Sequence, residues 1–212
     1  MNPLSIHSTS TKHSMSLYRD IFLPSYIKHC SHIHHTYQMS PGPDGGVGNH
    51  GSAEWFIGAR GKLELCMNMC KAEPSEVVCI SDVDMLWTGD PQGELSEIES
   101  NQIYVTRDNL VDDRINSGII AFRPSVKVFS MLEQALSYAN DHNLDDQDSI
   151  EATLQTKMLP LSFCNTKTID NTQQQSHVCY HPTVSQPSEG VSSQAKKMIH
   201  VKNYLYRFKK SG

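Results

Sequence analysis

The stretch that decides the fold reads Val77-Val78-Cys79-Ile80-Ser81-Asp82-Val83-Asp84-Met85. Its first four residues are a short apolar run, rich in β-branched side chains and bounded by polar residues, which predicts a buried strand. Two aspartates follow, separated by one residue. In extended chain such a pair projects to the same side, so both carboxylates can face one site.

Two like charges at one site are unfavourable unless a cation lies between them. Carboxylate oxygens favour Mg²⁺ or Mn²⁺, and such an ion neutralises a diphosphate and helps it depart. An Asp-x-Asp pair also occurs by chance, and its alternative interpretation is a solvated turn. Because this pair follows an apolar strand, we predict a metal site, with Asp84 facing solvent and the cation.

Signals for strands and helices alternate along the chain. We expect strands at residues 4–8, 33–39, 77–80, 103–105 and 117–122, and a polar loop from Ser8 onward. We expect helices at residues 17–29, with an interruption at Pro24, and at 55–70, 126–136 and 148–154, then an irregular tail over 172–196. This order predicts one α/β domain over residues 1–212, with a mostly parallel central sheet flanked by helices. Ligands of such sheets bind at the carboxyl ends of the strands.

The composition limits the function classes. The chain has 212 residues, 38% of them hydrophobic, which suits one globular domain. Its net charge of -5 argues against broad nucleic-acid binding, which needs a basic face. The sequence contains no apolar run long enough to span a membrane and no secretory signal at its start. We therefore expect a soluble cytoplasmic protein, although a fragment of a longer protein would look the same.

Residues 77–85 resemble the signature of nucleotide-diphospho-sugar transferases with the GT-A fold. Other segments resemble further elements of that family, in the family's order. They are the strand Asn116-Ser117-Gly118-Ile119-Ile120, which lines the donor sugar; Asp146-Gln147-Asp148, typical of retaining members; and Ile199-His200-Val201-Lys202, with the late histidine of the metal site. The resemblance spans residues 82–202 and is greatest to viral members that glycosylate capsid protein. It implies a GT-A (Rossmann-like) layered fold.

The family's activity implies a reaction for this chain. It is metal-dependent transfer of a hexosyl group from a UDP-sugar to a hydroxyl of a carbohydrate or glycoprotein glycan, with retention. The resemblance assigns Mn²⁺ or Mg²⁺ to Asp82, Asp84 and His200. This sequence departs from the family's pattern at two places. No aromatic residue that would stack on the base is evident near Ser8, and the glycine and tryptophan that often follow the histidine are missing.

The remaining assignments concern the donor and the reacting face. The resemblance implies that the nucleotide binds at the loop with Ser8 and Thr9. It implies that the diphosphate is bound at Asp82 and Lys202. It implies that the donor sugar is bound by Arg60, Asn116 and Asp146. It implies that Gln147 and Asp148 are catalytic.

Each assignment has a structural alternative. Asn116 suits a turn, Asp146 suits a helix N-cap, and Arg60 suits a helix surface. His200 is one of 11 histidines, and Lys202 belongs to a basic tail that could be solvated.

Two other functions fit an Asp-x-Asp pair. One is a phosphatase with an aspartyl nucleophile, in which the pair normally sits on the first strand with Thr or Gly close behind. Here Met85 and Leu86 follow instead. The other is a non-catalytic sugar-binding or metal-binding module, which would not turn over a UDP-sugar.

Overall fold

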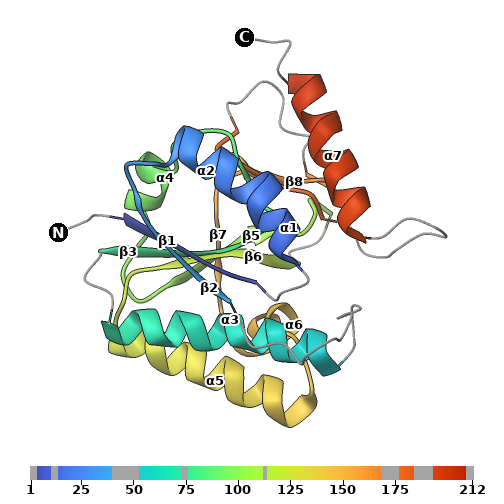
Figure 1. Cartoon of the computed structure of the whole chain (residues 1–212). Coiled ribbons are helices and arrows are strands. Elements are labelled where there is room, and N and C mark those ends of the chain that lie inside the picture. Colours follow the sequence, from blue (N-terminus) through green and yellow to red (C-terminus); the bar gives the residue numbers. More distant parts are fainter. Residues whose placement is uncertain are drawn as a thin grey trace.

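A six-stranded sheet forms the centre of the computed structural model (Figure 1), with strand order β2-β1-β3-β6-β5-β7. The structure describes residues 4–10, 14–39, 53–72, 76–111, 114–168, 177–183 and 193–208. The sheet consists of β1 (Leu4–Ser10), β2 (His34–Met39), β3 (Val77–Asp82), β5 (Ile103–Arg107), β6 (Ile115–Phe122) and β7 (Lys157–Met158). β6 runs antiparallel to β3 and β5, whereas the other neighbouring pairs are parallel. The prediction of a mostly parallel sheet is confirmed.

Helices cover both faces of this sheet. Figure 1 shows α3 (Ala53–Ala72), α5 (Val126–His142) and α6 (Asp146–Thr153) on one face. The other face carries α1 (Met15–Leu17), the π-helical turn η2 (Tyr18–Phe22), α2 (Leu23–His29) and α4 (Gln92–Ser96). None of the described helices has the length and apolar character needed to cross a membrane.

The apolar run before the aspartates is buried on both sides. Val77 and Cys79 belong to one core cluster, whereas Val78 and Ile80 belong to the cluster that packs under α3 and α5. Successive side chains of a strand point to opposite faces, so a strand between two layers of helices must be apolar at every position. This explains why the run does not alternate.

A second, three-stranded sheet lies beside the first and carries residues that matter for the site. Its order is β4 (Leu86–Trp87), β9 (Cys179–His181) and β8 (Phe163–Asn165). Helix α7 (Ser193–Phe208) packs Val201 and Tyr204 against Leu86 and Tyr180 of this sheet. The expectation of an irregular tail over 172–196 is therefore wrong for β9 and for the first turn of α7. Residues 172–176 and 184–192 of that tail lie outside the described residues.

Two expected boundaries differ in the structure. β1 continues to Ser10, so Ser8 and Thr9 are strand residues and not loop residues. The helical segment runs from Met15 to His29 and changes from a π-helical to an α-helical turn one residue before Pro24. Pro24 lies in the first turn of α2, where a missing backbone N–H is tolerated.

Candidate metal centre

The aspartate pair lies where β3 ends. Asp82 is the last residue of β3, and Asp84 lies in the tight turn that follows, in which the Met85 amide donates to the Asp82 carbonyl at 3.3 Å. The Asp82 side chain is 34% exposed, but Asp84 is only 3% exposed. The expectation that Asp84 faces solvent is therefore wrong, and its charge needs partners within the protein.

His181 completes a group of three possible metal ligands. Asp82, Asp84 and His181 each offer one ligand atom, and these atoms lie within 4.8 Å of one another. Among the described residues, no other set of three or more His, Cys, Asp or Glu side chains meets this condition. The small sheet explains the proximity, because Leu86 lies two residues after Asp84 and pairs with Tyr180, the neighbour of His181.

The donor set suits a divalent cation. His181 Nε2 lies 3.3 Å from Asp84 Oδ1, and this buried oxygen accepts no hydrogen bond from the described residues. Two carboxylates and an imidazole are ligands that Mn²⁺ and Mg²⁺ accept. A metal ion bound here would satisfy this carboxylate oxygen and the neighbouring imidazole nitrogen together.

Two lysines balance the charge of the buried carboxylates. Lys62 of α3 is 5% exposed and lies 2.8 Å from Asp82, 2.7 Å from Asp146 and 2.9 Å from the Ser117 carbonyl. Burial would lower the pKa of Lys62, but the charges of Asp146 and Asp82 outweigh it and raise the pKa. Lys62 is therefore charged and ties α3 and α6 to the end of β3.

Lys197 of α7 plays the corresponding part for Asp84. Its ammonium donates to Asp84 Oδ2, whereas Oδ1 is the oxygen near His181. Burial tends to raise the pKa of Asp84, but the charge of the Lys197 ammonium more than offsets it and holds the pKa well below its usual range. Asp84 is thus an anion in the folded protein.

The nucleotide residues expected from the resemblance lie at the neighbouring strand end. Thr9 of β1 pairs in register with Asp82 of β3, and Ser8 pairs with Tyr37 of β2. Ser8 is fully buried, with its hydroxyl 2.9 Å from His35 Nε2. Tyr37 is therefore an aromatic residue close to Ser8 that was not evident from the sequence. Its ring stacks on the Tyr18 ring, with 4.1 Å between the centroids.

The Asp146-Gln147-Asp148 segment forms the first turn of α6. Its N-cap is Asp145, whose side chain accepts from the Asp148 amide at 2.6 Å. Capping therefore does not account for Asp146, which pairs with Lys62. Gln147 is half-buried, and Asp148 lies 3.4 Å from Arg114. Lys62 thus links Asp146 of α6 to Asp82, the first aspartate of the pair.

Three predicted residues do not join this group. Arg60 donates to the Leu144 carbonyl at 3.3 Å and to Asn143 Oδ1 at 2.7 Å, so it fastens α3 to the turn between α5 and α6. His200 lies outside the metal-ligand group and instead lines a cavity of about 190 Å³ between α7 and β9. Lys202 is exposed, because it lies five residues after Lys197 and so about 140° around the helix.

The residues that do converge carried weak sequence signals. His181 follows the apolar run Val178-Cys179-Tyr180, the same strand-then-ligand order that marks Asp82, but the run is short. Lys62 and Lys197 stand near Arg60 and His200 in sequence, and nothing in the residue types separates the lysines that reach the site from their neighbours.

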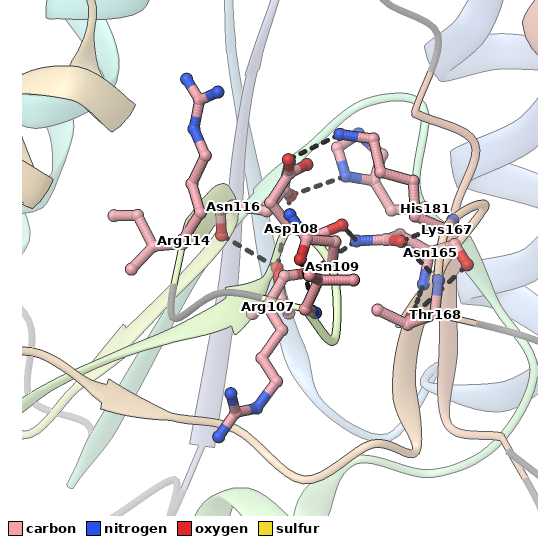
Figure 2. A network of polar contacts seen from close by, with 12 residues as sticks. Arg107, Asp108, Asn109, Arg114, Asn116, Asn165, Lys167, Thr168 and His181 are labelled. Atoms are coloured by element: carbon pink, nitrogen blue, oxygen red, sulfur yellow. Dashed lines mark hydrogen bonds and ion pairs between the residues drawn. The ribbon is translucent and has the colours of Figure 1, made fainter. Parts of the chain in front are cut away.

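A polar network forms the wall beside His181 (Figure 2). Asn165 of β8 donates to the Arg107 carbonyl at 2.6 Å and accepts from the amides of Lys167 and Thr168 at 2.9 and 3.1 Å. The Lys167 ammonium lies 2.5 Å from Asp108 Oδ2. These bonds join the end of β5 to β8 of the small sheet.

Comparison with known proteins defines the class. A family model described as nucleotide-diphospho-sugar transferase matches residues 31–205. The chain therefore belongs to this family, and the resemblance drawn from its motifs is confirmed. No curated protein sequence matches the chain.

Solved structures of glycosyltransferases share the fold. One is a glycosyltransferase involved in glycosylation of the major capsid of PBCV-1, with TM-score 0.63 and 12% identity, covering 94% of this chain and 98% of that one. The galactosyltransferase LgtC, solved with donor and acceptor sugar analogues, gives 0.65 and 8%, covering 93% and 94%. GlyE from Streptococcus pneumoniae TIGR4 gives 0.61 and 12%, covering 96% of this chain but 64% of GlyE. The GT-A fold is thereby confirmed.

Proposed function

We propose that this chain is a metal-dependent glycosyltransferase that moves a hexosyl group from a UDP-sugar to a carbohydrate hydroxyl. The observation that carries the proposal is the convergence of Asp82, Asp84 and His181 at the carboxyl end of β3, flanked by Lys62 and Lys197. In an α/β sheet this edge is where ligands bind. The family model supports the same class of reaction.

Asp82, Asp84 and His181 would hold Mn²⁺, or Mg²⁺, which when bound neutralises the diphosphate and favours its departure. Lys197, paired with Asp84, supplies a positive charge for phosphate oxygens. In this proposal His181 and Lys197 take the parts that the resemblance gave to His200 and Lys202.

In this proposal the UDP-sugar lies across the neighbouring ends of β1 and β3. Thr9 borders the nucleotide and the buried Ser8 lies behind it, bonded to His35, with the stacked Tyr18 and Tyr37 rings nearby as aromatic surface for the base. Lys62 replaces Arg60 as the basic group on α3 that serves the donor side.

The first turn of α6 contacts the sugar in this proposal. Asp146, held by Lys62, orients the sugar, and Asp148 supports the turn. Gln147 cannot act as a general base, but its carbonyl oxygen can stabilise a developing oxocarbenium ion. The absence of a base at this central position supports transfer with retention.

The acceptor we propose is a carbohydrate, including the glycan of a glycoprotein. A viral capsid glycoprotein is the narrower proposal, supported by the likeness in fold to the PBCV-1 enzyme over 98% of that chain. Membership of the nucleotide-sugar family argues against the phosphatase, whose aspartates would also lie on the first strand and not on the third along the chain. A non-catalytic module is distinguished by turnover alone.

Calorimetric titration of UDP with and without Mn²⁺ tests the site. We expect Mn²⁺ to tighten UDP binding at least about tenfold, or about 1.4 kcal/mol, and Asp84→Asn to abolish this gain. Asp90→Asn is the matched control, because Asp90 is exposed and pairs with His32 away from the site. Equal UDP affinity in Mn²⁺ and in EDTA would refute the metal assignment.

A further inference from the structure

Asn116 is held in an unusual backbone position beside His181. The register between β5 and β6 is interrupted: Val105 lies opposite Ile120, but Thr106 lies opposite Asn116. Such a bulge redirects side chains and is common beside functional sites. Here it brings Asn116, which is 7% exposed, against His181, which is 6% exposed (Figure 2).

The hydrogen bonds of Asn116 fix which of its side-chain atoms faces His181. The Gly118 amide donates to Asn116 Oδ1 at 3.1 Å. A backbone N–H can only donate, so the atom facing it is the oxygen and not the nitrogen of the amide. The Thr106 hydroxyl lies 2.9 Å from the Asn116 backbone carbonyl and 3.3 Å from the same Oδ1, and it also holds the residue in place.

This oxygen in turn determines the state of the imidazole. His181 Nδ1 lies 2.9 Å from the same Asn116 Oδ1. Because a carbonyl oxygen only accepts, Nδ1 must carry a proton. Nε2, 3.3 Å from Asp84 Oδ1, is then the nitrogen whose lone pair can bind a cation.

Gly118 provides the space for this contact. A Cβ atom at residue 118 would lie 2.5 Å from His181 Nδ1 and 2.6 Å from its Cε1, and 2.9 Å from Asn116 Oδ1. Any side chain there would push the ring off Asn116. The glycine thus serves the approach of a histidine ring from the small sheet, and Ser117 between them offers its carbonyl to Lys62.

We infer that Asn116 is a positioning residue for His181: its side-chain oxygen fixes the tautomer and the ring orientation that direct Nε2 toward Asp82 and Asp84. The inference rests on the proposed function, because a metal ion at these residues is part of it. It gives Asn116 a part in the metal centre besides the sugar contact expected from the resemblance.

A double-mutant cycle on Mn²⁺ affinity, without nucleotide, tests this role. Partners that orient metal-binding histidines typically contribute about 10- to 100-fold to affinity. We therefore expect Asn116→Ala to weaken Mn²⁺ binding by about that factor in the wild type. In the His181→Ala background Asn116→Ala should have no further effect, because Asn116 acts through the imidazole.

Asn116→Asp is the matched conservative variant. A carboxylate oxygen also accepts from Nδ1–H and from the Gly118 amide, so this variant should keep Mn²⁺ affinity near that of the wild type. Melting temperatures of all variants separate loss of folding from loss of binding.

Two calorimetric results would overturn the inference while leaving the metal site in place. One is unchanged Mn²⁺ affinity in Asn116→Ala; the other is an equal loss in both backgrounds. If wild-type protein binds no Mn²⁺, the proposed function itself fails. Should Asn116→Ala not fold, long-range proton–nitrogen NMR correlations of the metal-free wild type decide. A His181 proton on Nδ1 is expected, and a proton on Nε2 alone contradicts the inference.

Discussion

Replacing Lys62 by methionine removes the cation that neutralises two carboxylates. Lys62 is almost fully buried, with Asp82 and Asp146 2.8 and 2.7 Å away. Removing one partner of a buried ion pair costs about 3–5 kcal/mol, because the remaining charge is left uncompensated. At about 2–4 °C per kcal/mol for a chain of this size, the melting temperature should fall by about 6–20 °C.

Thermal and urea unfolding in EDTA, followed by circular dichroism, measure this effect. Lys71→Met on the same helix is the matched control. Lys71 is exposed, with its ammonium 4.6 Å from the centroid of the Phe129 ring, a contact that contributes about 0.5–1 kcal/mol.

Added Mn²⁺ should restore part of the stability of Lys62→Met, because a bound dication again offsets the Asp82 charge and stabilises the folded state by mass action. A loss no larger than that of Lys71→Met would refute the view that Lys62 holds the carboxylates together. If Mn²⁺ stabilises neither wild type nor variant, Asp82 is not a metal ligand.

Four substitutions separate the roles of residues around the site. Lys197→Ala should raise Mn²⁺ affinity without nucleotide, by removing a like charge at Asp84, yet lower UDP affinity in Mn²⁺; calorimetric changes in the same direction would contradict this. His200→Ala should leave Mn²⁺ affinity unchanged and His181→Ala should weaken it, and the reverse order would return the ligand role to His200. Gln147→Ala should lower kcat by about ten- to a hundredfold, or about 1.4–2.7 kcal/mol, with donor affinity unchanged. NMR of the product should show retention, and an inverted anomeric centre refutes it.

The central strand and its aspartates could be predicted because local sequence determines them. A strand buried on both faces must be apolar throughout, and residues 77–80 leave few other interpretations. The choice of histidine could not be predicted in this way. His181 reaches Asp84 through the pairing of Leu86 with Tyr180, a long-range contact between strands of two and three residues. Strands this short show no periodicity.

The choice between neighbouring basic residues depends on helix phase. Arg60 and Lys62 are two residues apart on α3 and so point about 200° apart around the helix. Their residue types alone do not say which one faces the sheet. For α7, the helical spacing of Val201, Tyr204 and Phe208 is a usable signal. The Gln-, Ser- and Pro-rich stretch before it obscures where the helix begins.

Release of UDP from a panel of UDP-hexoses tests the proposed reaction most directly. Wild-type protein with Mn²⁺ should release UDP from at least one donor, faster when a carbohydrate acceptor is present. EDTA or Asp84→Asn should abolish the release, and Asp90→Asn should not. UDP release at the same rate in EDTA, release of inorganic phosphate, or binding of UDP with no turnover of any donor would each contradict a metal-dependent glycosyltransferase.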